Sequence, residues 1–400
     1  MKTNIIHTLV VCLTICLLLF VEACSNQDDS QPEGGGNASL YLNITTIGQT
    51  RAELKTLSDN EKMHSVRVVV LHPNGTVEHN RFYSLDGPEE EKKLLLKVTP
   101  DETKKIFLFA NEESVTHVEG VSTAESGTTE SLSLTAFFGS YSQDAPGFAE
   151  AVNNLYFAPD YSDGKPIPMS SMYEIEVPKQ GAVQKTFYVV RVATKFTINF
   201  MNWRSETVTV NSLSIANHAD KNFLMAHVKD TEQNKKLFNG ETWIEWLKEV
   251  SGASSESDSY EETEAAGWLK DYELPADADN KKTYTYPTTI TVNPANVDIK
   301  YPTNSEPGKA QTPPIFYLPE SMNLKAGATD GEQEYTLTIH IAEGENQKTF
   351  NCPLRNLKAL FRNTHVVVNI TLKNSMEIVV DVIPYSEVFL DPIFGLNIKE

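Results

Sequence analysis

The stretch Ala-Ser-Leu-Tyr-Leu-Asn-Ile-Thr-Thr, residues 38–46, sets the pattern that decides the fold of this chain. Leu40, Leu42 and Ile44 fall on one face and polar side chains on the other, interrupted only by Tyr41. Side chains that alternate with a period of two predict a half-buried β-strand. Outward from this stretch, similar runs of β-branched, aromatic and aliphatic residues recur and end at Gly, Pro, Asn or Asp, which predicts further strands.

Strands are therefore expected along the whole chain. Asn74-Gly75 after the run 65–71 predicts a hairpin, because this dipeptide accepts the positive φ angles of a tight primed turn. The remaining predicted strands are 94–98, 106–110, 131–138, 172–177, 187–200, 207–216, 284–292, 315–318, 335–341, 364–372 and 376–383. About fourteen strands are too many for one β-sandwich and suit two seven-stranded ones. The predicted fold class is all-β, with few short helices.

We place the boundary between the two domains near Gly181. A Pro- and Gly-rich stretch at 158–171 and a strand ending at 178–181 precede it, and the long predicted strand 187–200 opens the next pattern. The expected organisation has four parts. A signal peptide at 1–23 precedes a lipidated tether with a removable first strand at 24–51. An N-terminal sandwich at 52–181 and a C-terminal sandwich with the donor strand at 182–400 follow.

Helical periodicity is scarce. In 241–250, Trp243, Trp246, Leu247 and Val250 form one apolar stripe, which predicts a short helix packed on a sheet face. A second short helix is expected at 357–361. The acidic, Ser-rich stretch 251–266 is expected to be a solvated loop.

Composition and charge exclude several function classes. The 400 residues are 40% hydrophobic and carry a formal net charge of -20. Proteins bind nucleic acid largely through Lys and Arg that displace counterions, so this acidic chain is not expected to bind nucleic acid. Its apolar content is sufficient for folded cores.

The first residues predict export as a lipoprotein. Lys2 is followed by an apolar stretch at 9–21, which suits a signal peptide and is too short to span a bilayer as a helix. Ala23-Cys24 resembles the end of a bacterial lipobox, so we expect a signal peptide at 1–23, lipidation of Cys24 and attachment to the outer membrane through acyl chains. The polar segment 25–36 then serves as a tether. Ordinary secretion, with Cys24 unmodified, is the alternative.

The sequence predicts no enzyme, cofactor or metal site. Cys12 and Cys16 lie in the predicted signal peptide and Cys24 takes lipid, so Cys352 alone remains and no internal disulfide is expected. None of the common hydrolase, nucleotide-binding or zinc-protease motifs is present. His72 and His79 share a predicted hairpin face, but no third ligand is evident, and we expect them to be solvated.

Several strings, in this order along the chain, resemble the fimbrillin family, the type V pilins of anaerobic gut and oral Gram-negative bacteria. They are IFLFAN at 106–111, IPMS at 167–170, RVATKF at 191–196, FYLPE at 316–320, RNTH at 362–365 and VFLDPIFG at 388–395. The resemblance implies two transthyretin-like β-sandwiches, lipoprotein export and assembly by strand exchange with copies of the chain and other fimbrial subunits. It also implies that a surface protease of trypsin-like or arginine specificity cuts between Arg51 and Ala52. The product would be an adhesive surface fimbrium.

Physical chemistry shows what such a cut would do. Losing the strand that carries Leu40, Leu42 and Ile44 removes three core side chains, each contributing about 1.5–3 kcal/mol. The total, roughly 5–9 kcal/mol, is comparable with the stability of a whole domain. An open sheet edge and an apolar groove would remain for a donor strand. We expect the donor at the C-terminal end, with Ile378, Val380, Val382, Val388, Leu390, Ile393 and Phe394.

Other interpretations remain open at this stage. The stretch 38–46 can be an ordinary permanent strand and Arg51 an ordinary loop residue. A surface glycan-binding lipoprotein would share the signal and the sandwiches, and clustered exposed aromatic residues (Trp243 with Trp246, or Trp268 with Tyr272) would favour it. A fimbrial anchor or tip subunit would look much the same. A β-sandwich hydrolase would need two close carboxylates with raised pKa.

Overall fold

The structure is a computed structural model, and it describes residues 38–46, 57–120, 132–226, 274–275, 277–294, 314–322, 335–343, 346–354, 359–360, 362–372 and 378–383. Within these ranges strands predominate and the two α-helices are short, which confirms the all-β fold class. No helix in this part of the chain is long and apolar enough to cross a membrane.

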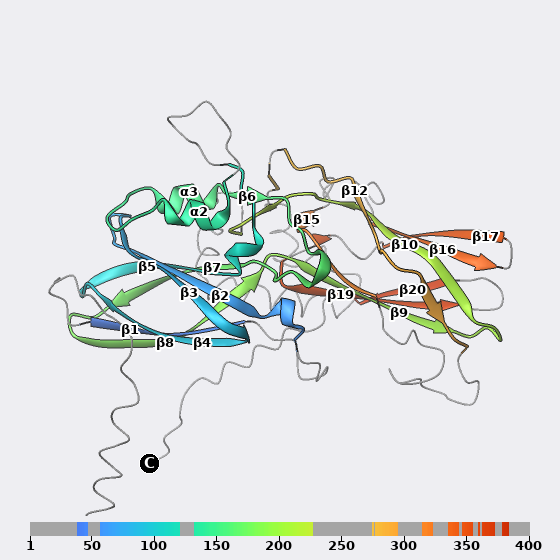
Figure 1. Cartoon of the computed structure of the whole chain (residues 1–400), viewed down its shortest axis with the longest axis horizontal. Helices are drawn as coiled ribbons and strands as arrows, with labels where there is room; N and C mark the ends of the chain where they lie inside the picture. Colours follow the sequence, from blue (N-terminus) through green and yellow to red (C-terminus); the bar gives the residue numbers. More distant parts are fainter. Residues whose placement is uncertain are drawn as a thin grey trace, which may run out of the picture. The chain divides into compact units, whose positions relative to one another are not determined.

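The N-terminal sandwich contains seven strands (Figure 1), the expected number, although they include β8, which the sequence assigned to the C-terminal domain. One layer has the order β4–β1–β8 and the other β3–β2–β5–β7, and β7 pairs with β8 over two residues, which joins the layers. The strands are β1 (Ala38–Thr46), β2 (Met63–Leu71), β3 (Val77–Glu89), β4 (Glu91–Val98), β5 (Glu102–Ala110), β7 (Met169–Val177) and β8 (Gly181–Arg191). Alternate side chains of both layers form one buried core.

The change from one sandwich to the other falls after Arg191, about ten residues beyond the expected boundary at Gly181. The predicted strand 187–200 is in fact two strands, β8 and β9 (Thr194–Asn202). They are separated by Val192 and Ala193, and β8 pairs with β7 and β1 of the N-terminal sandwich. Both strands are apolar and alternating, so composition alone does not mark the point where the chain changes sheet.

Two helices, α2 (Leu134–Gly139) and α3 (Phe148–Asn153), form a second core against β2 and β5. The strand predicted at 131–138 is wrong. Ser133 caps α2 by accepting a hydrogen bond from the Ala136 backbone N–H, and Phe137 and Phe138 pack on Phe148. Aromatic residues favour strands by propensity, but here this packing overrides the preference.

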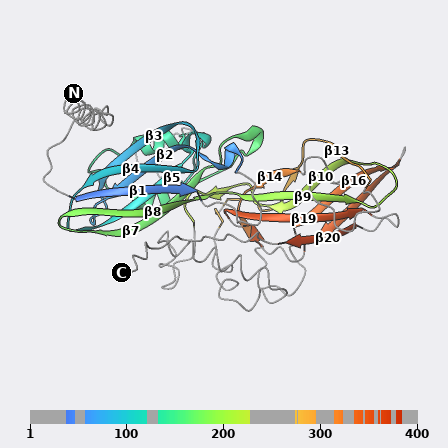
Figure 2. The same cartoon turned by 90° about the horizontal axis from the view of Figure 1, so that it is seen from below.

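The C-terminal sandwich has two layers, one in the order β14–β9–β19–β20 and the other built around β10 and β16 (Figure 2). Its strands are β9, β10 (Val208–His218), β12 (Lys282–Thr285), β13 (Ile290–Val292), β14 (Ile315–Leu318), β16 (Thr336–Glu343), β17 (Asn346–Pro353), β19 (Thr364–Leu372) and β20 (Ile378–Ile383). The strand predicted at 284–292 is divided, because β12 and β13 pair with different parts of β10. The described residues therefore hold more than seven strands here.

Two short strand pairs complete the described fold. β6 (Tyr156–Phe157) pairs with β11 (Asn222–Phe223), and β15 (Ser321–Met322) pairs with β18 (Ala359–Leu360). The helix predicted at 357–361 is wrong, because the backbone of Ala359 and Leu360 pairs with β15 instead. The helix predicted at 241–250 and the acidic stretch 251–266 lie outside the described residues.

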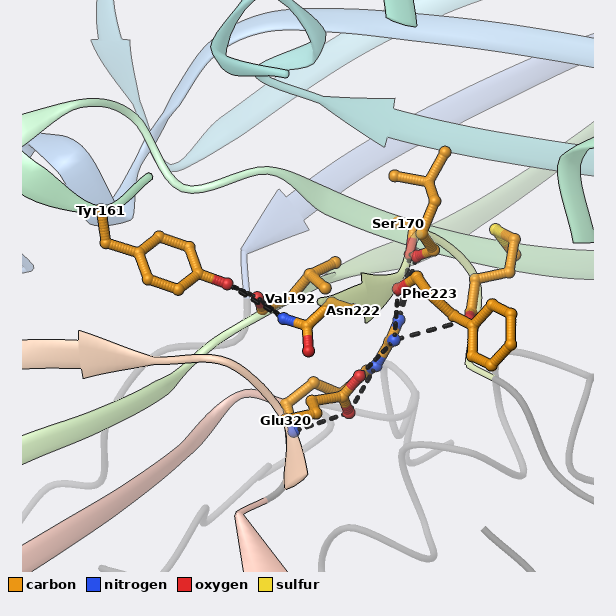
Figure 3. A network of polar contacts seen from close by, with 9 residues as sticks. Tyr161, Ser170, Val192, Asn222, Phe223 and Glu320 are labelled. Atoms are coloured by element: carbon orange, nitrogen blue, oxygen red, sulfur yellow. Dashed lines mark hydrogen bonds and ion pairs between the residues drawn. The ribbon is translucent and has the colours of Figure 1, made fainter. Parts of the chain in front are cut away.

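A buried ion pair ties the segment before β19 to the N-terminal sandwich (Figure 3). Arg362 is 1% exposed, and its Nε and Nη2 donate to the Glu320 carboxylate at 2.8 and 2.5 Å. The same guanidinium donates to Ser170 Oγ on β7 and to the carbonyl oxygens of Phe223 and Leu224. A buried charge is costly unless it is paired and hydrogen-bonded, and these contacts meet that requirement for Arg362. All of the contacting residues are distant from Arg362 in sequence, so the contacts join separate segments of the chain.

A second set of polar contacts holds the link between β8 and β9. The hydroxyl of Tyr161 and the side-chain amide of Asn222 both donate to the carbonyl oxygen of Val192 (Figure 3). Burial raises the pKa of Tyr161, so the hydroxyl keeps its proton and stays a donor. The link is thus fixed by side chains from two other segments.

Candidate functional site

The candidate site is the place of β1 within the sheet. β1 lies between β4, to which it is antiparallel, and β8, to which it is parallel. Leu42 is opposite Leu94 on one side and Lys185 on the other. β1 therefore lies between two strands that come much later in the chain, β4 about fifty residues and β8 about 140 residues after it. Without β1, these two strands have no shared partner.

The inward side chains of β1 are completely buried. Leu40 and Ile44 are 0% exposed and Leu42 is 2% exposed, as the sequence predicted. They belong to one core together with residues of the opposite layer, including Val68 and Tyr173. The earlier figure of roughly 5–9 kcal/mol for removing them therefore applies to fully buried groups.

The outward face of β1 is partly apolar and partly polar. Tyr41 is 46% exposed and lies opposite Leu95, which is 53% exposed. Asn43 is opposite Thr186 on β8, and its Nδ2 donates to the threonine Oγ1 at 3.4 Å. The sequence did not reveal this neighbour, because the expected boundary separated β8 from β1. The alternation of Val183, Lys185, Phe187 and Val189 was the available signal.

The residues on which processing is predicted flank β1 in the sequence. Thr46, the last residue of β1, donates its backbone N–H to the carbonyl oxygen of Glu90. Cys24, Arg51 and Ala52 lie outside the described residues. The lipidation and cleavage sites therefore stay predictions.

The predicted donor residues divide into two groups. Ile378, Val380 and Val382 lie on β20, whose backbone pairs with β19 in the C-terminal sandwich. β20 is at the end of its layer in the described strand order. Val388, Leu390, Ile393 and Phe394 lie outside the described residues, and donation stays a prediction for both groups.

The titratable residues near the β2–β3 hairpin form ion pairs and hydrogen bonds. Lys104 is 0% exposed and lies 2.7 Å from the Glu78 carboxylate, and it also donates to Glu102. His72 Nδ1 is 2.9 Å from Glu102, and His79 Nε2 is 2.6 Å from the carbonyl oxygen of Lys97. The two histidines are thus half-buried and hydrogen-bonded, where solvated ones were expected. In the described ranges no group of three His, Cys, Asp or Glu residues can hold a metal ion.

In the part of the chain that the structure describes, the carboxyl groups whose pKa is shifted do not match an acid catalyst. Burial alone would raise the pKa of Glu102, but hydrogen bonds from Lys104 and His72 lower it below its ordinary value. Hydrogen bonds from Lys165 and Ser162 lower the pKa of Asp160 to about 2. A lowered pKa is typical of carboxylates held in ion pairs, whereas the acid catalyst of a hydrolase would need a raised pKa.

Comparison with solved structures finds fimbrial proteins. The tip fimbrial protein Mfa3 from Porphyromonas gingivalis, with a C-terminal truncation, is 10% identical at a TM-score of 0.48, covering 87% of this chain and 99% of that one. The fimbrilin FimA from P. gingivalis W83 is 10% identical at 0.45, with 88% and 98% covered. The fimbrial anchor protein Mfa2 from P. gingivalis is 9% identical at 0.35, with 87% and 99% covered. No family model and no curated protein matches the chain.

Proposed function

We propose that this chain is a structural subunit of a surface fimbrium, made as a lipoprotein precursor, trimmed by a protease and polymerised by strand exchange. The observation that carries the proposal is the placement of β1. It is a nine-residue strand with a completely buried apolar face, and it sits between two strands of its own sheet. The family resemblance of the sequence and the names of the fimbrial proteins above agree with this role.

The first step is detachment of β1. The segment between β1 and Leu57 contains Arg51, and a cut between Arg51 and Ala52 by a protease of arginine or trypsin-like specificity separates β1 from the rest covalently. When the detached β1 then dissociates, β4 and β8 expose unpaired backbone groups, and the core loses Leu40, Leu42 and Ile44. An unpaired sheet edge beside an apolar groove binds an alternating apolar strand.

The second step is filling of the groove by the C-terminal end of another subunit. Each subunit then carries one donor and one acceptor, and a head-to-tail contact of this kind forms an open filament rather than a closed ring. Lipidation at Cys24 holds the precursor at the outer membrane, and cutting at Arg51 releases the subunit from that anchor into an extracellular fimbrium that mediates adhesion. The role is structural and requires no enzymatic activity.

The experiment follows assembly in vitro. A chain beginning at residue 25 is treated with an arginine-specific protease, and the products are analysed by N-terminal sequencing and by electrophoresis without boiling. The expected result is a start at Ala52 and a ladder of high-mass species. The matched control is Arg51→Lys, which keeps the charge but removes the cleavage site, and it should remain uncut and monomeric.

Two outcomes would contradict the proposal. One is a polymer formed by the uncut Arg51→Lys chain. The other is a polymer in which peptide 38–46 is still present in stoichiometric amount, because the groove would then never have been vacated. A complementary variant lacking 388–400 should fold and stay monomeric before the cut, and it should form no ladder after it.

A further inference from the structure

A buried lysine lies among two carboxylates at the end of the N-terminal sandwich where β3 and β5 begin. Lys104 of β5 is 0% exposed, and its Nζ lies 2.7 Å from Oε2 of Glu78 on β3. The same Nζ donates a hydrogen bond to Glu102 Oε2. The Glu78 side chain is 8% exposed and that of Glu102 is 27% exposed. Water is therefore almost excluded from the contact between Lys104 and Glu78.

The two carboxylate oxygens of Glu78 have different surroundings. Oε1 accepts hydrogen bonds from the Thr99 backbone N–H at 2.5 Å and from the Thr99 hydroxyl at 2.8 Å. Oε2 is buried and has no hydrogen-bond partner among the described residues, although Lys104 Nζ is close to it. The direction of this contact is therefore not that of a hydrogen bond. A carboxyl group with two donors on one oxygen and an amine beside the other has the arrangement of an acyl-transfer electrophile.

Glu102 is placed to move a proton of the lysine. Its carboxylate accepts from Lys104 Nζ and lies 2.9 Å from His72 Nδ1. Burial would raise the pKa of Glu102, but hydrogen bonds from Lys104 and His72 lower it, so the carboxylate is ionised and can accept a proton. The site thus contains a nucleophile, a base oriented by a third residue, and two donors at the oxygen where charge would develop.

We propose that Lys104 and Glu78 become joined by an amide bond, which the folded chain forms by itself. Glu102 takes one proton from the Lys104 ammonium, and the neutral Nζ attacks Cδ of Glu78. The Thr99 donors hold the negative charge that develops on Oε1. Oε2 then leaves as water with the proton from Glu102 and a second proton from Nζ. One N–C bond forms, one C–O bond breaks and Glu102 is regenerated, so the reaction needs no oxidant or other reactant.

The fixed, buried geometry supplies the driving force. A free amine and a free carboxylate do not condense in water, because both are charged and water is in large excess. Groups held in contact behave as if their concentration were about 10⁵–10⁸ M, and a site closed to water protects the product from hydrolysis. The amide also removes two charges from a place where charge is costly. Lys104 and Glu78 meet both conditions, contact and burial.

The bond would connect two strands that share no backbone hydrogen bonds. β2 lies between β3 and β5 in the sheet, and the amide would close a covalent loop from residue 78 to residue 104 around the end of β2. Such a loop restricts the unfolded chain as a disulfide does, whereas Cys352 is the only cysteine among the described residues. The inference is independent of strand exchange, because none of these residues lies on β1 or β20.

Mass spectrometry of the intact, uncut chain beginning at residue 25 tests the bond. The mass should be lower than that of the sequence by one molecule of water, and digestion should yield a branched peptide that joins Glu78 to Lys104. Lys104→Arg keeps the positive charge but removes the nucleophile, so the branched peptide should be absent. Glu102→Gln keeps the shape of the side chain but removes the base, and the bond should form at least ten-fold more slowly.

A second measurement uses the natural sequence and does not depend on the folding of any variant. Chain recovered unfolded in denaturant should have its full mass, and the water should be lost only after refolding, which circular dichroism follows. A refolded natural chain that keeps its full mass would overturn the inference and leave an ordinary ion pair.

The remaining outcomes test the assigned roles. A branched peptide that joins Lys104 to Glu102 would overturn Glu78 as the acceptor. Equal rates of water loss in Glu102→Gln and the natural chain would overturn Glu102 as the base. Loss of water without any branched peptide would place the reaction elsewhere in the chain and overturn the cross-link. The proposed function stands in each case, because assembly after the cut is measured separately.

Discussion

The two sandwiches place their first strands in the same way but join them to the chain differently. β1 in the N-terminal sandwich and β9 in the C-terminal sandwich each lie inside a layer and run parallel to a strand near the end of their domain. β9 follows β8 after only Val192 and Ala193, which are 0% and 3% exposed. β1 is joined to Leu57 by residues 47–56, which contain Arg51.

This difference determines which strand a single cut can release. The link to β9 is buried and bonded: the Val192 N–H donates to the carbonyl oxygen of Pro168, and the Asn363 N–H donates to that of Ala193. A protease needs an accessible, extended chain, so this link is protected. The same sheet position is therefore permanent in one sandwich and, in our proposal, exchangeable in the other.

The largest expected effect comes from removing β1 when no donor is available. In a chain lacking 388–400, cut at Arg51 and separated from the β1 peptide, the N-terminal sandwich should lose roughly 5–9 kcal/mol, which is comparable with its whole stability. Hydrogen exchange followed by mass spectrometry should show lost protection in β2 and β5, with protection retained in β9 and β19. Equal protection in both sandwiches would mean that β1 contributes no more than an ordinary segment.

The next effect concerns the ion pair that holds the segment before β19. Arg362→Met leaves the buried Glu320 carboxylate without its partner, and the free energy of unfolding should fall by about 3–5 kcal/mol. The double variant Arg362→Met, Glu320→Gln removes both charges and should recover most of that loss in urea unfolding. If the single variant unfolds at the same urea concentration as the unaltered chain, the pair does not hold this segment.

A pair of matched core variants separates a permanent strand from a removable one. Ile198→Ala on β9 should lower stability by about 2–5 kcal/mol in both the precursor and the assembled form. Leu42→Ala on β1 should cost about the same in the precursor and nothing in the polymer, because β1 has left. Thermal unfolding of both forms measures this, and a Leu42→Ala polymer that melts earlier would argue that β1 stays.

A pH-dependent contribution is expected from Glu61, which is 3% exposed and bonds to Lys195 of β9 at 3.0 and 3.1 Å. Burial would raise its pKa, but Lys195, the Ser58 hydroxyl and Arg191 together lower it below the ordinary 4.5. A lowered folded-state pKa stabilises the protein above about pH 4.5, and this contribution is lost as pH falls through the lower folded value. Glu61→Gln should flatten the decline of melting temperature in that window, and an unchanged decline would exclude Glu61.

The smallest effect concerns Asn43, whose Nδ2 donates to Thr186 Oγ1 across the β1–β8 pair. Asn43→Ala should cost up to about 1 kcal/mol in the precursor and nothing in the polymer, because β1 has left. Urea midpoints of both forms provide the measurement. An effect of Asn43→Ala on the polymer would contradict the replacement of β1.

The sequence predicted those elements in which a strict period of two coincides with a buried face. β1, β10 and β19 lie close to their expected positions for this reason. Prediction from the sequence failed where pairing between residues distant in sequence decides the structure. The residues around Phe137 are helical because of an aromatic cluster, and β18 is a strand because β15 pairs with it.

The candidate site shows the same division. Burial of Leu40, Leu42 and Ile44 followed directly from their alternation. The parallel neighbour β8, and with it Thr186, could not be predicted, because strand order depends on contacts about 140 residues apart.

The interior position of β1 has a mechanical consequence. A strand at a sheet margin is held by one ladder of backbone hydrogen bonds, whereas β1 is held by two, one to β4 and one to β8. Any occupant of this slot must break both ladders together before it can leave, so β1 itself departs slowly after the cut, and the donor strand that replaces it is held as firmly whatever the concentration of free subunits. A fibre joined in this way would owe its endurance to a high barrier against opening, and its joints would outlast dilution and shear.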